Sequence, residues 1–191
     1  MTVTDYTIGF DTAMNTVIDL VDKLRDTCES HARCNVVEVM GRNAGFLAMY
    51  VGLAVGATAV LVPEKEVDFE KDVIEKIRQA RFNGFTHYMI VVAEGAGSAS
   101  DIAKRIKQSI DLDPRVTVLG HIQRGGSPSA RDRILASRMG DAAVEALMEG
   151  QRNVMIGIQN GEICYVPIAK ALQKRKQIVR EHLELVKILS I

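Results

Sequence analysis

The side chains able to do chemistry in this sequence cluster in short glycine-containing stretches that follow apolar runs. In "TVLGHIQRGGSPSARDR" (residues 117–133), His121 stands three residues before Arg124, directly after a β-branched run that ends at Gly120. Imidazole and guanidinium groups both donate hydrogen bonds to anions, and neighbouring glycines let the backbone come close to a ligand. The pair indicates an anion site, for which phosphate is the natural candidate. A structural turn with a surface arginine fits the same residues.

Two further stretches carry charge at the same kind of position. "VMGRNAG" (39–45) places Gly41 and Arg42 just past an apolar run, and "VVAEGAGS" (91–98) places Glu94 past another. A carboxylate beside two arginines can accept hydrogen bonds from sugar hydroxyls. It can equally form a salt bridge that only holds the arginines in place, and Arg42 alone fits a tight turn with a solvated side chain.

Four apolar runs must position these residues, and they span 34–40, 58–63, 87–93 and 115–120. Helical patterns alternate with them over 10–28 and 43–54, after an N-cap at Asp68, and after an N-cap at Ser98 or Ser100. Strands that are apolar throughout are covered on both faces, so the pattern predicts an α/β three-layer sandwich with a mostly parallel, Rossmann-like sheet. Ligands of such sheets lie beyond the carboxyl ends of the strands, where these loops should converge.

The pattern changes in the last third of the chain. Ser127 as N-cap and Pro128 as first helical residue predict a helix that runs to about Met148. It is followed by a predicted hairpin over 153–168 that turns at Asn160-Gly161, and by a charged amphipathic helix over 173–190.

Composition narrows the class of protein. Of 191 residues, 47% are apolar and 25% charged, and the formal net charge is zero, which is typical of a globular protein and does not fit a nucleic-acid-binding protein. No apolar window is long enough for a membrane span, and no signal peptide is visible. Three scattered cysteines (Cys28, Cys34 and Cys164) are expected as free thiols in the cytoplasm.

Two other arginines, Arg33 and Arg115, each stand just before a predicted strand. Strand polarity therefore places them at the edge of the sheet opposite Arg42 and Arg124. They are either solvated there or serve the site of a neighbouring subunit. An unrelated dinucleotide-binding domain would need a third glycine that "EGAGSAS" lacks.

The stretches "TIGFDTAMNTVID", "VEVMGRNAG", "VVAEG" and "TVLGHIQRGGSPSARDR" together resemble the carboxyl-terminal, substrate-binding portion of bacterial-type 6-phosphofructokinases. The resemblance runs over nearly the whole chain. That family of glycolytic kinases uses Mg²⁺ to transfer a phosphoryl group from ATP, or from pyrophosphate, to the 1-hydroxyl of fructose 6-phosphate. The resemblance implies the phosphofructokinase fold in part.

The resemblance also implies roles for single residues. The implied fructose 6-phosphate site comprises Met40, Gly41, Arg42, Glu94, His121 and Arg124. In it Glu94 takes sugar hydroxyls, His121 and Arg124 hold the 6-phosphate, and Arg42 also lies near the transferred phosphoryl group.

By the same resemblance, Arg33 and Arg115 complete the 6-phosphate site of an adjacent subunit in a homo-oligomer, a dimer or a tetramer. This agrees with the strand-edge argument. Arg25 matches an arginine that contacts the regulator's phosphate. Thr58 and Phe85-Thr86 stand where the family has further effector-binding side chains, so regulation by the family's usual effectors is not expected.

The resemblance further implies that an amino-terminal nucleotide half is absent. That half carries the GGDGS and TIDND loops, with the catalytic base and the Mg²⁺ ligand, and Asp5 does not match the base. Residues 1–121 with 173–191 are then the fructose 6-phosphate-binding domain, and 122–172 packs on the absent nucleotide-binding domain. We expect no turnover from this chain alone. The alternative is a non-catalytic sugar-phosphate-binding or regulatory module.

Overall fold

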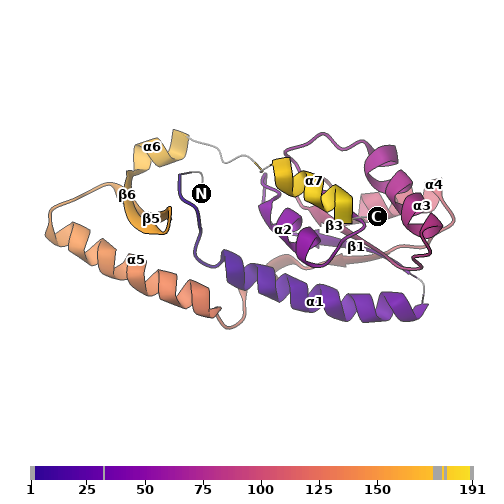
Figure 1. Ribbon diagram of the computed structural model, residues 1–191, viewed down its shortest axis with the longest axis horizontal. Coiled ribbons are helices and arrows are strands. Elements are labelled where there is room, and N and C mark those ends of the chain that lie inside the picture. The colour runs from indigo at the N-terminus through magenta and orange to yellow at the C-terminus, as the bar shows by residue number, and fades with distance from the viewer. Residues whose placement is uncertain (1–2, 32, 174–177, 179, 190–191) are drawn as a thin grey trace. The chain divides into compact units, whose positions relative to one another are not determined.

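The computed structural model describes residues 3–189, apart from residues 32, 174–177 and 179. Helices and strands alternate through the first two thirds of the chain (Figure 1). In chain order the elements are α1 (Phe10–His31), β1 (Cys34–Val39), α2 (Phe46–Ala54), β2 (Ala59–Leu61), η1 (Glu70–Ile74), α3 (Glu75–Phe82), β3 (Tyr88–Ala93), α4 (Ala99–Ser109), β4 (Arg115–Val118), η2 (Gly120–Arg124), α5 (Ala130–Met148), β5 (Val154–Gln159), β6 (Glu162–Pro167), α6 (Ile168–Gln173) and α7 (Arg180–Leu189).

The four predicted strands form one parallel sheet in the order β2-β3-β1-β4, which confirms the predicted fold class. Val36 of β1 lies opposite Ile90 of β3 on one side and Val116 of β4 on the other. The last strand ends at Val118, two residues earlier than predicted. The reason is Gly120, whose φ of +52° turns the chain into the 3₁₀ helix η2.

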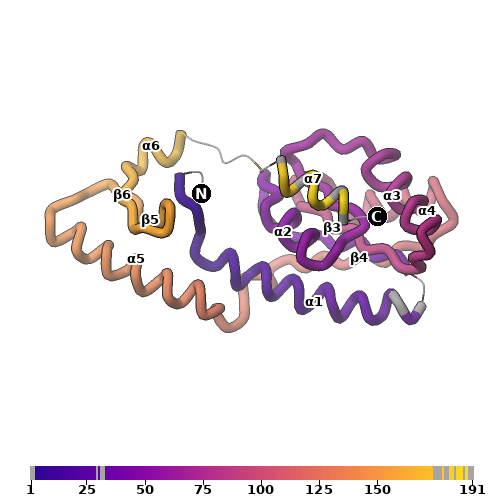
Figure 2. The backbone as a smooth tube through the Cα atoms, viewed as in Figure 1, coloured from indigo at the N-terminus to yellow at the C-terminus, as the bar shows by residue number. Residues whose placement is uncertain are grey.

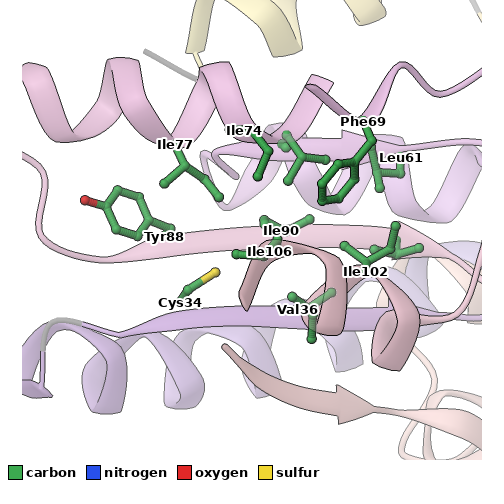
Figure 3. Close-up of a cluster of buried hydrophobic side chains, with 14 of the residues drawn as sticks. Cys34, Val36, Leu61, Phe69, Ile74, Ile77, Tyr88, Ile90, Ile102 and Ile106 are labelled. Atoms are coloured by element: carbon green, nitrogen blue, oxygen red, sulfur yellow. The ribbon is translucent and has the colours of Figure 1, made fainter. Parts of the chain in front are cut away.

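Helices cover both faces of this sheet. On one face a cluster of buried side chains joins the strands to α3 and α4 (Figure 3), including Val36, Leu61, Ile74, Ile77, Ile90, Ile102 and Ile106. On the other face Asn35 donates to the Cys28 sulfur of α1, and Gly52 of α2 lies directly against Val60. α7 returns to pack beside α2 (Figure 2). Burial of one isoleucine side chain contributes about 2 kcal/mol to the free energy of unfolding. This core therefore stabilises the sheet that carries the loops.

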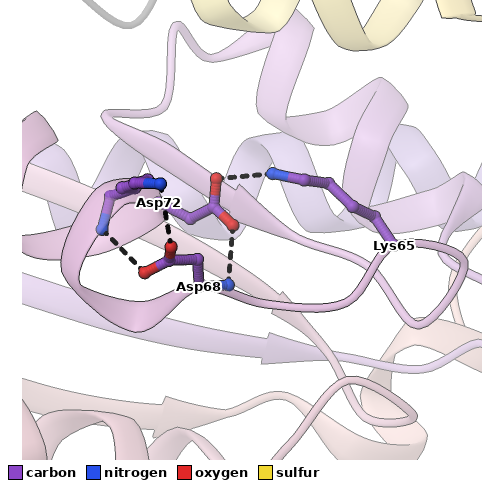
Figure 4. A network of polar contacts seen from close by, with 4 residues as sticks. Lys65, Asp68 and Asp72 are labelled. Carbon is purple, nitrogen blue, oxygen red and sulfur yellow. Dashed lines mark hydrogen bonds and ion pairs between the residues drawn. The ribbon is translucent and has the colours of Figure 1, made fainter.

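The helix after β2 begins with reciprocal capping, as predicted from Asp68 (Figure 4). The Lys71 amide donates to Asp68 Oδ1 at 3.2 Å, and the Asp68 amide donates to Asp72 Oδ2 at 3.0 Å. Lys65 Nζ lies 2.5 Å from Asp72 Oδ1. The Lys71 N–H is the main reason that the pKa of Asp68 is lowered. The first turn is π-helical, over Glu70–Ile74, before α3 continues.

The start of α5 corrects the sequence-based prediction. The N-cap is Ser129, not Ser127, and Pro128 precedes the cap instead of opening the helix. Ser129 Oγ accepts from the Asp132 amide at 3.3 Å, whereas Ser127 Oγ accepts from Arg133 Nη2 at 2.9 Å. The extended backbone of Ser129, with ψ of 158°, explains why the helix begins two residues later.

The hairpin of β5 and β6 turns at Asn160-Gly161 as predicted. Both residues have positive φ, +52° and +82°, which is the geometry of a type I′ turn. The predicted tail helix over 173–190 is confirmed only for α7, because residues 174–177, 179 and 190 lie outside the described part, and Gln173 closes the separate short helix α6.

Two compact units make up the chain. Met1–Thr12 and Gly126–Gln177 form one, the hairpin unit, and Ala13–Gly125 and Ile178–Ile191 form the other, the sheet unit. The predicted division, residues 1–121 with 173–191 against 122–172, concerns packing on a nucleotide-binding half and stays a prediction. The first residues group with the hairpin because the Asp5 amide donates to the Ile158 carbonyl at 2.8 Å.

All three cysteines are free thiols. In the described part of the chain, no helix is long and apolar enough to cross a membrane.

Candidate functional site

Three loops of the sheet unit meet at the carboxyl edge of the sheet because β1 lies between β3 and β4. They are the Arg42 loop (residues 40–45), the Glu94 loop (94–98) and the His121 turn (119–125). The Glu94 amide donates to the Val39 carbonyl at 2.9 Å, and the Leu119 amide donates to the Glu38 carbonyl at 3.2 Å. The structure thus brings the six residues expected at one site to a single sheet edge.

Glu94 is the link between the first two loops. Its Oε1 accepts from the amides of Gly41 at 3.0 Å and Arg42 at 2.5 Å. These two N–H donors, with Arg42 first, lower the pKa of Glu94, and the positive charges of Arg124 and Arg42 add to the effect. Among the described residues Glu94 forms no ion pair, and its side-chain partners are the two backbone amides of the Arg42 loop.

The Arg42 loop is tightly built. Arg42 has a φ of +53°, a left-handed conformation that is uncommon for a residue with a side chain. A Cβ on Gly95 would overlap the Arg42 carbonyl oxygen, and one on Gly41 would overlap the Ala44 carbonyl oxygen. Glycine is therefore required at position 95 for the Glu94 loop to approach the Arg42 loop, and at position 41 for the Arg42 loop to turn within itself. The Arg42 side chain is exposed.

The His121 turn presents His121 and Arg124 on its exposed surface. Residues three apart in a 3₁₀ helix share one side, so the imidazole and the guanidinium project together. Between them Gln123 points inward and is only 3% exposed. Its Oε1 accepts from the Met40 amide at 3.2 Å, and its Nε2 donates to the Gly120 carbonyl at 3.0 Å.

Carboxylates already occupy the helix N-termini at this edge. Both oxygens of Glu64 accept from the Gly45 amide, the N-cap of α2, at 2.9 and 3.0 Å. Glu38 Oε2 accepts from the Ala99 amide at the start of α4, at 2.9 Å. Helix N-termini ordinarily attract anions. The Gly45 and Ala99 amides are thus satisfied within the chain, and the cationic side chains of the three loops, Arg42, His121 and Arg124, are exposed.

Arg33 and Arg115 lie at the opposite edge of the sheet. Six residues of β1 separate Arg33 from Met40, a span of about 20 Å. Arg115 Nη2 lies 3.7 Å from Asp113 Oδ2, and Lys107 Nζ lies 2.7 Å from Asp113 Oδ1. Lys107, followed by Arg115 and Arg33, lowers the pKa of Asp113. The structure does not bring this pair together with Arg42 and Arg124.

Two other residues singled out from the sequence have structural partners. Arg25 Nη2 of α1 donates to the Val55 carbonyl, and its Nη1 lies 3.9 Å from Asp22 Oδ1. Asp5 Oδ2 accepts from the Asn160 amide at 2.5 Å, so this carboxylate holds the hairpin turn.

A buried carboxylate network in the hairpin unit was not predicted from any sequence pattern. Asp132 of α5 is 2% exposed and accepts from the Tyr6 hydroxyl at 2.9 Å and the Gly9 amide at 3.0 Å. It also accepts from the amide and the hydroxyl of Thr12, at 2.9 and 2.5 Å. Burial opposes ionisation of Asp132, but these donors outweigh it and lower its pKa. Burial and the Asp132 hydrogen bond together raise the pKa of Tyr6 to about 12.

Side chains that could bind a metal ion are scattered over the described part of the chain. Over the described residues, no three His, Cys, Asp or Glu side chains gather into a group that could hold a metal ion. The acidic residues at the carboxyl edge are instead committed to backbone amides.

Comparison with known proteins points in one direction. The family model described as Phosphofructokinase matches residues 1–147. The chain is 54% identical over 188 residues to an ATP-dependent 6-phosphofructokinase of Bacillus cytotoxicus and 53% identical to one of Bacillus thuringiensis. These matches cover 98% of this chain but 59% of each relative, so the chain spans about three fifths of the length of the curated relatives it matches.

Solved structures show the same likeness. The chain resembles phosphofructokinase from Saccharomyces cerevisiae with a TM-score of 0.86 and 33% identity, over 99% of this chain and 26% of that one. A pyrophosphate-dependent phosphofructokinase from Marinobacter aquaeolei shares the fold at a TM-score of 0.75 and 23% identity, over 96% of this chain and 54% of that one.

Proposed function

The chain belongs to the phosphofructokinase family, and from that premise we propose that it supplies the fructose 6-phosphate site of a 6-phosphofructokinase. The complete enzyme would transfer a phosphoryl group from ATP, or from pyrophosphate, to the sugar 1-hydroxyl in cytoplasmic glycolysis. The relatives of similar sequence are named ATP-dependent, which favours ATP as the donor.

One observation carries the proposal. Arg42, His121 and Arg124 are exposed on loops that meet at one edge of the sheet. At this edge the amides of Gly41, Arg42, Gly45 and Ala99 already donate to Glu94, Glu64 and Glu38. A sugar phosphate offers a dianionic end and several hydroxyls. Guanidinium and imidazole donors suit the phosphate, because charge-assisted hydrogen bonds to phosphate are the strong ones.

Glu94 suits the hydroxyl end of the same ligand. Its Oε1 is engaged by two amides, and an ionised carboxylate has further acceptor capacity at Oε2. Its lowered pKa keeps it ionised near neutral pH. We infer that Oε2 accepts from sugar hydroxyls while Met40 and Gly41 line the sugar.

Arg42 is proposed to act near the transferred group as well. Phosphoryl transfer spreads negative charge over the phosphoryl oxygens, and a fixed guanidinium stabilises it. The fixed backbone of the Arg42 loop supports that role. This chain offers binding and orientation, whereas the base and the Mg²⁺ ligands are proposed to lie in a nucleotide-binding half.

Arg33 and Arg115 are proposed to complete the 6-phosphate site of a second subunit in a homo-oligomer, a dimer or a tetramer. Their position at the amino edge, beside Asp113, supports a role outside the site of their own chain. Arg25 is not proposed as an effector-binding residue, because Thr58 and Phe85-Thr86 stand where the family has its other effector-binding side chains.

Calorimetric titration of the 191-residue chain with fructose 6-phosphate tests the proposal. We expect saturable binding that Arg124→Ala weakens at least about tenfold, as expected for loss of a charge-assisted hydrogen bond. Lys104→Ala, an exposed cation on α4, is the matched control and should leave binding unchanged. Equal binding by Arg124→Ala and the unmodified chain would reject the assigned site.

A turnover assay separates the enzyme from the alternative, a non-catalytic regulatory module. With fructose 6-phosphate, Mg²⁺ and ATP, we expect no fructose 1,6-bisphosphate from this chain alone. Turnover on addition of a nucleotide-binding half supports the kinase. Binding without turnover in that reconstituted mixture favours the module, and turnover by the chain alone would contradict the proposed division of roles.

A further inference from the structure

In the His121 turn a polar side chain, Gln123, is buried, whereas its apolar neighbour is exposed. Ile122, an apolar neighbour, is 56% exposed, whereas the Gln123 amide is 3% exposed. Burying an amide is unfavourable unless its hydrogen bonds are made. Gln123 therefore occupies the interior for its hydrogen bonds and not for its apolar surface.

Its two hydrogen bonds reach two different segments. Oε1 accepts from Met40 at the start of the Arg42 loop, and Nε2 donates to Gly120 at the start of the His121 turn. The last backbone bond between β4 and β1 joins Leu119 to Glu38. Beyond it, in the described part of the chain, no other hydrogen bond joins residues 120–125 to residues 40–45.

The two segments that Gln123 joins carry different parts of the site. The Arg42 loop holds Arg42, which the proposed function places beside the sugar, and the His121 turn holds His121 and Arg124. Glu94, which follows β3, binds the Arg42 loop on one side. Gln123, which follows β4, binds the same loop on the other side through the Met40 amide. Small displacements between groups that hold one ligand reduce its binding and reactivity strongly.

We propose that Gln123 is a positioning residue that couples the Arg42 loop to the His121 turn and so sets the spacing between the sugar contacts and the phosphate contacts. This inference rests on the proposed function, because the spacing matters only for a ligand that spans both segments. Gln123 itself does not touch the ligand.

A double-mutant cycle measured with fructose 6-phosphate tests the coupling. Dissociation constants are determined for Arg42→Ala, Arg124→Ala and their combination, first with Gln123 present and then in a Gln123→Met background. With Gln123 present, we expect the combined loss to differ from the product of the single losses by about fivefold. In the Gln123→Met background, this deviation should fall below about twofold.

Gln108→Met is the matched control, since Gln108 is exposed near the end of α4. Helix α4 follows β3 and returns toward the amino edge of the sheet, so its end lies away from the site. If Gln123 only stabilises the fold, Gln123→Met will weaken binding but leave the fivefold deviation unchanged. That result would overturn the proposal. If Gln123→Met does not fold, Gln123→Asn keeps an uncharged amide whose shorter side chain does not reach both partners, and it is expected to lower the deviation in the same direction.

Amide NMR spectra keep the test independent of ligand binding. Gln123→Met should shift the resonances of residues 40–45 together with those of residues 119–125, whereas Gln108→Met should shift neither. If the unmodified chain does not bind fructose 6-phosphate, the proposed function fails. The amide shifts still test whether Gln123 couples the Arg42 loop to the His121 turn. Unchanged resonances for residues 40–45 would overturn the coupling itself.

Discussion

Two carboxylates in different units of the molecule perform similar local tasks in opposite surroundings. Glu94, at the carboxyl edge of the sheet unit, is exposed and accepts from two backbone amides. Asp132, in the hairpin unit, is buried and accepts from two amides and two hydroxyls. The exposed carboxylate retains acceptor capacity for a ligand, whereas the buried one is fully used. The difference fits the proposed role of Glu94 in binding and a role of Asp132 in stability.

The largest expected effect on stability is at Asp132. Asp132→Ala leaves the Gly9 and Thr12 amides and the Tyr6 hydroxyl without their acceptor, and should lower the free energy of unfolding by about 3 kcal/mol. Urea denaturation measures the change. Asp141→Asn, exposed on the same helix, is the control and should stay within about 0.5 kcal/mol. Equal effects of the two substitutions would remove the contrast with Glu94.

Gly95→Ala should follow in size. The added Cβ overlaps the Arg42 carbonyl oxygen, and relieving that overlap should cost about 2 kcal/mol of stability and also displace the Arg42 loop. Gly140→Ala on α5 meets no atom within 4 Å and should be neutral or stabilising. Paired thermal melts compare the two variants, and a fully stable Gly95→Ala chain would show that the two loops are not in close contact.

Acid pH should distinguish the same pair of units. The pKa of Asp132 is lowered in the folded chain, so its contribution is present above the unfolded value near 4 and is lost as pH falls through the folded value. Unfolding free energy measured between pH 6 and about pH 2.5 should therefore fall less steeply for Asp132→Asn than for the unmodified chain. Parallel curves would mean that the Asp132 charge does not stabilise the hairpin unit.

Glu94→Gln should change stability least and binding clearly. Glutamine is similar in shape and keeps an acceptor oxygen for the two amides, so the free energy of unfolding should fall by only about 1 kcal/mol, the part that the charge adds to these hydrogen bonds. Loss of the charge should weaken fructose 6-phosphate binding about tenfold, since hydrogen bonds to charged groups are the stronger ones. Calorimetry and urea denaturation on one preparation compare both quantities. A large loss of stability with unchanged affinity would show that Glu94 stabilises the fold, as Asp132 does, and does not bind the ligand.

The sequence predicted the sheet well because its signal is local. Each strand is a continuous apolar run, and the Asn160-Gly161 turn has its own conformational preference. The start of α5 was misassigned because Ser127 and Ser129 are both acceptable caps, and the choice depends on Arg133 taking Ser127 as its partner.

The supports of the candidate site were not predictable in the same way. Glu64 caps a helix 19 residues before it, and Asp132 binds an amide 123 residues away. Gln123 looks like any polar turn residue until its burial is known. Sequence patterns indicated the exposed cations, whereas the side chains that position them are identified by long-range partners that no spacing encodes.

The most direct test of the central claim is an NMR titration of the ¹⁵N-labelled 191-residue chain with fructose 6-phosphate. We predict saturable shifts in the amides of residues 40–45, 94–98 and 119–125, with inorganic phosphate affecting mainly the last group. Shifts confined to the neighbourhood of Arg33 and Arg115, or no shifts at all, would contradict a sugar-phosphate site at the carboxyl edge of the sheet.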